Sequence, residues 1–306
     1  MSEYVLQTAD LTKTYSRVNV VDKVNIEIKK GDIYGFIGKN GAGKTTTIRV
    51  IVGLAGQSSG EIELFGEKNL NIGRRKTGTV IEYPALYPYM TAEGNVECQR
   101  ILLGVKDKNK TKIKEILDIV GLGNTGKKKA KNFSLGMKQR LAIALALIGD
   151  PEFLFLDEPT NGLDPTGIKE IRDLILKLNK ERDITVMVSS HILGELAKIA
   201  TRYGVISKGK LVKEFYADDL KDLVRNKIKI KVNDAKTAVS LIKNQLNIKN
   251  CELKDDTIYV YDHLDESGKI SSLLAKHDII IESISKDSDD CEEFFIKLME
   301  GEDQDA

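Results

Sequence analysis

Tryptophan is absent from this chain of 306 residues, and proline, cysteine and histidine are scarce, with five, three and three copies. The cysteines are odd in number and widely spaced, which favours reduced thiols over a disulfide or metal framework. The histidines have no companion ligands at metal-binding spacing, so we do not expect a structural zinc site. These shortages argue against disulfide-rich and zinc-stabilised folds.

Long apolar runs and an excess of charge of one sign are also lacking. The longest apolar run, residues 141–148, is far shorter than the roughly 20 residues that cross a bilayer, and residues 1–4 do not indicate a signal peptide. The formal net charge of +1 gives no electrostatic footprint for nucleic acid. Hydrophobic residues make up 41% of the chain and charged residues 30%, as in ordinary globular proteins. We therefore expect a cytoplasmic globular protein that does not bind nucleic acid.

The order of apolar segments predicts an α/β domain over residues 1–215. Short strand-like runs alternate with helical segments there, which is typical of a largely parallel sheet. Residues 91–149 contain helical patterns and no strand pattern, so we expect a helical subdomain inserted in this domain. The expected strands include residues 24–28, 33–37, 61–65, 153–157 and 184–189, and a further helix is expected near residues 192–200.

Residues 216–306 differ in character and predict a second, smaller domain. Alternating strands and helices indicate the order β-α-β-β-α-β, so we expect an α+β accessory domain of the ferredoxin-like type. It carries no catalytic motif, which favours a structural or regulatory role. The expected elements include a strand at 227–232, a helix at 235–246, strands at 257–261 and 279–281, a final helix at 291–299 and an acidic tail at 302–306.

Residues 38–45, with the sequence GKNGAGKT, fit the phosphate-loop pattern GxxxxGK[ST] at every fixed position. The loop follows a strand-like run and precedes residues 46–52, which have helical spacing and end at Gly53. Glycines let successive backbone N–H groups surround a polyphosphate, and the helix N-terminus adds unpaired donors. A glycine-rich turn before a helix is the alternative, but it does not explain so many positions in register.

We therefore predict that the chain binds a nucleoside triphosphate. Lys44 is expected to bridge the β- and γ-phosphates, and the Thr45 hydroxyl to complete a Mg²⁺ shell. The residues expected to surround the phosphates are Gly38, Lys39, Asn40, Gly41, Ala42, Gly43, Lys44, Thr45 and Thr46.

Two acids follow the apolar strand predicted at 153–157. In a parallel sheet the ligand lies at the carboxyl ends of the strands, where Asp157 and Glu158 emerge. We expect Asp157 to hold Mg²⁺, directly or through water, and Glu158 to polarise the attacking water. An acidic strand end that opens a turn is the alternative, which the upstream phosphate loop makes weak. His191 directly follows another strand and is expected to contact the γ-phosphate.

A long helix begins in the segment of residues 132–140, NFSLGMKQR. Ser134 can cap this helix, but a simple cap does not explain Gly136, because glycine in a first turn destabilises a helix without a packing or ligand reason. A serine hydroxyl and glycine-exposed amides at a helix N-terminus form a second anion site.

In this order, the phosphate loop, the Ser-x-Gly helix, the strand-Asp-Glu motif, residues 161–164 (NGLD) and His191 resemble the ATP-binding cassette of ABC transporters over about residues 3–215. The resemblance implies that two cassettes close head to tail, with ATP and Mg²⁺ between one phosphate loop and the other subunit's Ser-x-Gly helix. It implies that Ser134 and Gly136 bind the γ-phosphate of the partner's ATP. Tyr15 then occupies the place of the residue that stacks on adenine, and Asp164 lies in the loop that crosses the dimer interface.

Three departures from the family pattern narrow the resemblance. The usual Leu-Ser-Gly-Gly-Gln is FSLGM at residues 133–137, and Asn161 stands where serine is common. Glu82 replaces a glutamine that touches Mg²⁺ and the attacking water in a loop beside the membrane subunit. The segment VIEYPALYP at 80–88 is similar to cassettes of bacitracin and lantibiotic export or self-immunity systems. We expect Glu82 to keep its metal contact but to alter communication with the membrane partner.

The resemblance thus implies an ATP hydrolase that drives a separate integral-membrane permease and lies peripherally on the inner face of the cell membrane. Its partner cassette is a second copy or a paralogue, and the transported compound a peptide antibiotic or a lipid-linked compound. One alternative is an ABC ATPase that acts on ribosomes or DNA, but such relatives carry two cassettes or a coiled-coil insertion, and this chain has neither pattern. The other is a nucleotide-binding regulator without hydrolysis, which the intact pair Asp157 and Glu158 disfavours.

Overall fold

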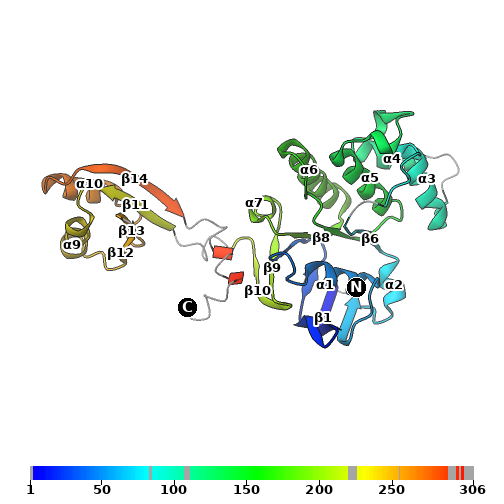
Figure 1. Ribbon diagram of the computed structural model, residues 1–306, viewed down its shortest axis with the longest axis horizontal. Helices are drawn as coiled ribbons and strands as arrows, with labels where there is room; N and C mark the ends of the chain where they lie inside the picture. Colours follow the sequence, from blue (N-terminus) through cyan, green and yellow to red (C-terminus); the bar gives the residue numbers. More distant parts are fainter. Residues whose placement is uncertain are drawn as a thin grey trace. The chain divides into compact units, whose positions relative to one another are not determined.

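The computed structural model separates the chain into two compact units, residues 1–217 together with 297–306, and residues 218–296 (Figure 1). Each unit has its own apolar core. The residues that the structure describes are 3–82, 85–106, 111–219, 226–254, 256–288, 294–295 and 298–299. The predicted helix at 291–299 and the acidic tail lie mostly outside these residues.

The larger unit is built around a six-stranded sheet of order β10-β9-β4-β8-β7-β6. Neighbouring strands are parallel except β9 and β10, which are antiparallel. Strands β4, β7 and β8 are buried along their whole length, as expected for parallel strands covered on both faces. Their carboxyl ends therefore meet at one edge of the sheet. The strands are β4 (Ile33–Ile37), β6 (Thr77–Val80), β7 (Phe153–Asp157), β8 (Thr185–Ser190), β9 (Arg202–Ser207) and β10 (Lys210–Tyr216).

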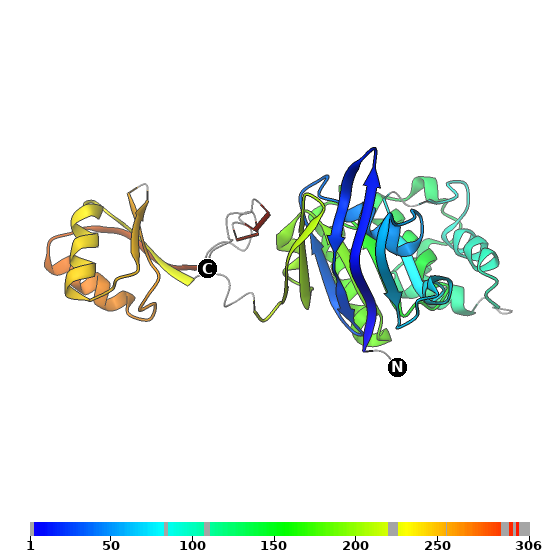
Figure 2. The same cartoon turned by 90° about the horizontal axis from the view of Figure 1, so that it is seen from below.

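An antiparallel sheet and one helix cover one face of this central sheet. Strand β1 pairs with β2, β3 and β5, and Figure 2 shows its length against the shorter strands. Apolar side chains of this sheet and of α1 pack against Phe36 and Phe155 of the central sheet. Figure 1 shows α6 on the other face. The elements are β1 (Tyr4–Tyr15), β2 (Val18–Val24), β3 (Glu27–Lys29), α1 (Lys44–Val52), β5 (Ser59–Leu64), α2 (Leu70–Arg74), α6 (Pro165–Arg182) and α7 (Leu193–Leu196).

Between β6 and β7, the described residues form helices and no strand. Helix α3 (Ala92–Leu102) is capped by Thr91, whose hydroxyl accepts a hydrogen bond from the Gly94 N–H. Helix α4 (Thr111–Ile119) packs against α5 (Leu135–Leu147). The side chains of Ile113, Ile116 and Leu117 on α4 are buried, as is the apolar face of α5. Two 3₁₀ turns, Gly123–Thr125 and Ala130–Asn132, connect α4 to α5.

The smaller unit is a four-stranded antiparallel sheet of order β12-β13-β11-β14, with two helices that share one core with it. Along β11, Ile228, Ile230 and Val232 enter this core, while the alternate lysines lie on the opposite face of the sheet. The elements are β11 (Asn226–Val232), α9 (Ala235–Gln245), β12 (Cys251–Lys254), β13 (Thr257–Val260), α10 (Ser267–Lys276) and β14 (Ile281–Ser288).

Three predicted elements differ from the structure. The strand expected at 24–28 is interrupted, because the Thr8 hydroxyl donates to Val24 O and accepts from Ile26 N in place of a continuous ladder. The strand expected at 279–281 begins only at Ile281 and runs to Ser288. The helix expected near 192–200 is the single turn α7. Strand β6 was not predicted, since its short Thr-Gly-Thr-Val sequence carries little apolar pattern.

Candidate active site

The phosphate loop lies between β4 and α1, as the sequence predicts. Gly41 and Gly43 have φ of 80° and 109°, a region that favours glycine. A Cβ on Gly43 would lie 2.7 Å from Val20 O, and one on Gly38 would lie 2.5 Å from Ile206 O. A Cβ on Gly41 would meet nothing within 4 Å, so packing within the chain leaves that side of the loop open. The loop therefore presents backbone amides where side chains would block a ligand.

Lys44 is the first residue of α1, and its side chain is only 5% exposed. Its Nζ donates to Gly38 O at 2.6 Å, which folds the side chain back along the loop. It also lies 3.2 Å from Glu158 Oε1. Both contacts keep the ammonium at the centre of the loop, where it can bind a phosphate oxygen.

Thr45 and Asp157 form a compact pair of oxygen donors. The Thr45 hydroxyl lies 2.7 Å from Asp157 Oδ2, and Asp157 is 2% exposed at the end of β7. The hydroxyl of Ser189 donates to the other carboxylate oxygen, Oδ1, at 2.5 Å. No group of three or more acidic, histidine or cysteine side chains arranged to hold a metal is present among the described residues. This donor set fits Mg²⁺, which prefers oxygen ligands and usually takes most of them from water and phosphate.

Glu158 follows Asp157 in a left-handed backbone conformation, with φ of 49°. Its N–H contacts both the Ser189 carbonyl and the Ser189 hydroxyl, at 3.3 and 2.9 Å. His191 Nδ1 lies 2.8 Å from Glu158 Oε2. The structure thus brings Lys44, Asp157, Glu158 and His191 together at the carboxyl edge of the sheet, as the sequence predicts.

Ser134, Gly136 and Asp164 lie on other elements. The Ser134 hydroxyl caps α5 by accepting from Met137 N at 3.2 Å, and Asp164 caps α6 by accepting from Gly167 N at 3.0 Å. A Cβ on Gly136 would meet no atom closer than 3.9 Å, so no packing within the chain requires glycine there. Among the described residues, neither Ser134 nor Gly136 hydrogen-bonds to the phosphate loop.

Tyr15 ends β1, is 48% exposed, and has Lys13 Nζ 4.8 Å from its ring centroid. An exposed aromatic ring beside a cation offers a stacking surface to a planar base. The structure shows no other partner for this ring among the described residues.

Glu82 is exposed and has a positive φ of 59°. Its Oε1 lies 2.6 Å from an Arg49 guanidinium nitrogen on α1, and this is its only ion pair among the described residues. The predicted metal contact of Glu82 stays a prediction. Sequence reasoning did not find Arg49, because nothing local marks a pairing across this distance in the chain.

Two further contacts around the site were missed. The sequence predicts Ser189 only as the last residue of the strand at 184–189, and the signal that could have indicated its role is a hydroxyl at the end of an otherwise apolar strand. The Thr160 hydroxyl donates to Glu195 on α7 at 2.5 Å and connects the loop after Glu158 to the segment after His191.

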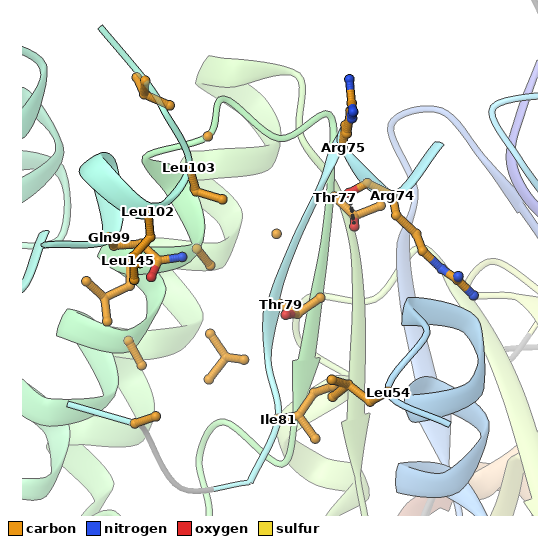
Figure 3. Close-up of a pocket in the computed structure, with 17 residues that line it drawn as sticks. Leu54, Arg74, Arg75, Thr77, Thr79, Ile81, Gln99, Leu102, Leu103 and Leu145 are labelled. Carbon is orange, nitrogen blue, oxygen red and sulfur yellow. Dashed lines mark hydrogen bonds between the residues drawn. The ribbon is translucent and has the colours of Figure 1, made fainter. Parts of the chain in front are cut away.

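A hollow of 920 Å³ lies beside this site, between the free edge of β6 and helices α3 and α5 (Figure 3). Figure 3 shows Gln99, Leu102 and Leu103 facing Thr79 and Ile81 across it. Ile81 and Ala85, on either side of Glu82 in the chain, both line the hollow. None of the phosphate-loop residues lines it.

Fold and site together define a phosphate-loop nucleoside triphosphatase with its acids at the strand ends. The family model for ABC transporters matches residues 21–161. The bacitracin transport ATP-binding protein BcrA of Bacillus licheniformis is 46% identical over 301 residues, which are 97% of this chain and 98% of that protein. The lantibiotic transport ATP-binding protein SrtF of Streptococcus pyogenes is 42% identical over 227 residues, 73% of this chain and 97% of that protein.

A solved structure of a dimeric ATP-binding cassette, in a post-hydrolysis state bound to ADP and phosphate, is similar to this chain. The match covers 69% of this chain and 98% of the solved chain. It matches with a TM-score of 0.62 and 28% identity. The chain therefore belongs to the ATP-binding proteins of ABC transporters, which are ATPases. Across the residues the structure describes, none of the helices is both long and apolar enough to span a membrane.

Proposed function

We propose that this protein is the ATP-hydrolysing subunit of a transporter whose permease is a separate membrane protein, and that the transported compound is a peptide antibiotic of the bacitracin or lantibiotic type. The observation that carries the proposal is the 46% identity, over nearly the whole chain, to a bacitracin transport ATP-binding protein. The lantibiotic relative and the Glu82 segment support the same substrate class. The protein then works on the inner face of the cell membrane, held there by the permease.

In this proposal Lys44 and the amides of the phosphate loop bind the β- and γ-phosphates. The Glu158 carboxylate is the general base, because it lies beside Lys44 and carries no short hydrogen bond on Oε1. His191 orients Glu158 through their 2.8 Å contact and would itself contact the γ-phosphate. Water attack on the γ-phosphorus releases ADP and phosphate, and Glu158 takes the proton from that water.

Mg²⁺ is the metal that the oxygen donors favour. Thr45 and Asp157 would hold it, with phosphate oxygens and water as the remaining ligands. When bound, the ion neutralises charge that develops on the phosphate oxygens. Glu82 is the third candidate, and it would have to leave Arg49 to reach the ion.

Two cassettes are proposed to bind ATP between them, since the matched solved structure is a cassette dimer. Ser134 and Gly136 would then contact the γ-phosphate bound by the other subunit. Packing within the chain does not require glycine at position 136, so the bound phosphate would be the reason for it. Asp164 would lie at the interface, and Tyr15 would stack on adenine. The partner is a second copy or a paralogue.

The hollow beside β6 is the proposed docking surface for the permease. Exposed Leu102 and Leu103 line it, at 72% and 52% exposure, and a patch of this kind on a surface marks an interaction site. The Glu82 segment borders it, so a permease seated there would touch the loop next to the active site.

The smaller unit is proposed to be a ferredoxin-like accessory domain, and residues 1–215 and 216–306 to be the two functional domains. Support comes from the order β-α-β-β-α-β and the sheet order β12-β13-β11-β14. The lantibiotic relative aligns over 227 residues, nearly its whole length, so it has no room for both units. This supports a structural or regulatory role for the smaller unit rather than a catalytic one.

The test is co-expression of this chain with a candidate membrane permease from its own genome, followed by affinity capture and a peptide-antibiotic sensitivity panel. We expect the two proteins to co-purify and to raise resistance to a bacitracin-type or lantibiotic peptide. A Lys44→Ala variant should co-purify but confer no resistance, because it retains the docking surface and loses ATP turnover. Capture of ribosomes or DNA instead of a permease would overturn the proposal.

A further inference from the structure

Ser189 is a fully buried hydroxyl at the carboxyl end of β8. The preceding residues Val186, Met187 and Val188 are apolar and buried, as this strand requires. A hydroxyl in such a place destabilises the fold unless it is hydrogen-bonded. Its partners are therefore the reason for its presence.

The partners of Ser189 are the two acidic residues of the active site. Its Oγ lies 2.9 Å from the backbone N of Glu158 and 2.5 Å from Asp157 Oδ1. The Glu158 N–H can only donate, so the Ser189 oxygen accepts there. The single hydroxyl proton of Ser189 is then committed to Asp157. One side chain thus holds the carboxylate of one acid and the backbone of the other.

Both acids need this support for geometric reasons. Asp157 ends β7, and its second oxygen, Oδ2, faces the Thr45 hydroxyl. A fixed hydrogen bond on Oδ1 stops the carboxylate from rotating and leaves Oδ2 directed at Thr45. Glu158 has a left-handed backbone, which is unfavourable for a residue with a side chain. Its N–H bond to Ser189 stabilises this turn and sets the direction in which the Glu158 side chain leaves the strand.

We propose that Ser189 is a positioning residue for ATP hydrolysis, which orients Asp157 toward the metal and Glu158 toward the attacking water. Ser189 acts through these two acids and does not touch the nucleotide. The inference rests on the proposed roles of Asp157 and Glu158. Partners of metal-binding groups of this kind typically change metal affinity or activity by about 10–100-fold when removed.

The test compares Ser189→Ala with a matched neighbour, Ser190→Ala, in the full-length protein. Ser190 is also buried, but its hydroxyl bonds to Ile192 and touches neither acid. Two quantities are measured: Mn²⁺ affinity of the ADP-bound protein by electron paramagnetic resonance, and kcat at saturating Mg²⁺ and ATP. Thermal unfolding and metal-free ADP affinity serve as checks on the fold.

For Ser189→Ala we expect Mn²⁺ affinity and kcat each to fall by about 10-fold or more, with metal-free ADP affinity unchanged. Ser190→Ala should keep both within about two-fold of wild type, since it leaves both acids in place. Should Ser189→Ala fail to fold, Ser189→Cys keeps the side-chain size with a weaker donor and should show the same losses in smaller degree.

Wild-type Mn²⁺ affinity and kcat in the folded Ser189 variant would overturn the inference, as would equal losses in Ser190→Ala. The proposed function is tested separately by Glu158→Gln. If that variant loses turnover while the Ser189 variant does not, the hydrolytic site stands and only the positioning role of Ser189 fails.

Discussion

Glu158 makes different contacts through its two carboxylate oxygens. Oε1 lies 3.2 Å from Lys44 Nζ, and Oε2 lies 2.8 Å from His191 Nδ1. The residue therefore connects the lysine proposed to bind phosphate to the histidine that follows the next strand. At the scale of single residues, a substitution of Glu158 can separate nucleotide binding from hydrolysis. Glutamine has nearly the same size and shape as glutamate, but its neutral amide cannot act as the proposed general base.

We expect Glu158→Gln to lower kcat by about 10²–10⁴-fold, the usual contribution of a general base. ATP binding should persist, and the variant should accumulate as an ATP-bound dimer, seen by gel filtration with and without ATP. Glu152→Gln is the control, because Glu152 directly precedes the same strand and, among the described residues, its only ion pair is with Lys76 at the surface. Wild-type turnover in Glu158→Gln would contradict the assignment.

Arg49 and Glu82 allow a second test at this scale. Their side chains are 40% and 57% exposed, so the ion pair itself should contribute only about 0–1 kcal/mol to stability. We expect Glu82→Gln to unfold at nearly the wild-type temperature but to change the ATPase rate in the presence of the permease. Arg49→Gln, which removes only the partner, is the matched variant. Unchanged ATPase rate and unchanged peptide resistance in Glu82→Gln would show that the carboxylate has no special role.

At the scale of elements, the site is assembled by strands whose ends coincide. The residue pairs Ile37 with Ser190 and Asp157 with Ser189 place the ends of β4, β7 and β8 side by side. The sequence predicts this because the phosphate loop and the Asp-Glu pair are local patterns attached to strongly apolar strands. It does not predict β6 or the break at residues 25 and 26, since these depend on pairing with β7 and on the Thr8 hydroxyl.

For the same reason the sequence predicts the acidic residues of the site but not the residues that contact them. Ser189 reaches Asp157 from a neighbouring strand, and Arg49 reaches Glu82 from α1. Both contacts depend on how distant segments pack. A motif fixes which residue types are needed at short spacing, whereas these contacts become visible only in three dimensions.

Strands β4, β9 and β10 are joined by a polar cluster inside the larger unit. The hydroxyl of Tyr34 donates to Glu214 at 2.6 Å, and Arg202 pairs with Glu214 at 2.8 Å. Burial raises the pKa of the Glu214 carboxyl, while the Tyr34 hydrogen bond and the Arg202 charge lower it. Burial and the neighbouring Glu214 charge raise the pKa of Tyr34 well above its usual value, so the phenol stays protonated and donates.

The pKa of Glu214 is higher in the folded state than in the unfolded state. As pH rises from the unfolded-state pKa to the folded-state pKa, the contribution of Glu214 to the free energy of unfolding therefore falls. Tyr34→Phe removes a group that lowers the folded-state pKa, so in the variant this pH range extends to higher pH. We expect the variant to lose about 1.5–3 kcal/mol at about pH 8 and less at about pH 5, because the lower value lies nearer the raised pKa of Glu214 and the bond to a charged acceptor counts for less there. Urea unfolding at both values checks this.

Tyr15→Phe is the control for this change, since Tyr15 is exposed and its hydroxyl makes no hydrogen bond among the described residues. It should leave the free energy of unfolding nearly unchanged at both pH values. Equal losses at the two values in Tyr34→Phe would contradict the role of the ionised carboxylate.

At the scale of the whole molecule, two compact units share one chain, and only the larger one carries the phosphate loop and the acids. The sequence predicts both units, because alternating patterns mark each of them. It cannot predict what the larger unit docks against, since a docking surface is defined by neighbours from different elements. The hollow between β6 and α3, which we propose as this docking surface, is formed by such neighbours.

We expect Leu103→Asp to reduce co-purification with the permease by about 10-fold or more, because a charge is placed where an apolar contact is proposed. ATP binding by the isolated subunit should not change. Ile280→Asp is the control, because Ile280 is equally apolar and 66% exposed but lies in the smaller unit. Full permease capture by the Leu103 variant would place the docking surface elsewhere.

The proximity of Lys44 to Glu158 has a consequence for affinity measurements. A triphosphate that binds Lys44 brings its anionic oxygens close to the Glu158 carboxylate, which is already paired with the Lys44 ammonium. The glutamine variant relieves this repulsion, so it should hold ATP more tightly even before any block of cleavage is considered. Its gain in ATP retention is therefore the sum of an electrostatic and a kinetic effect, which a non-cleavable ATP analogue can separate.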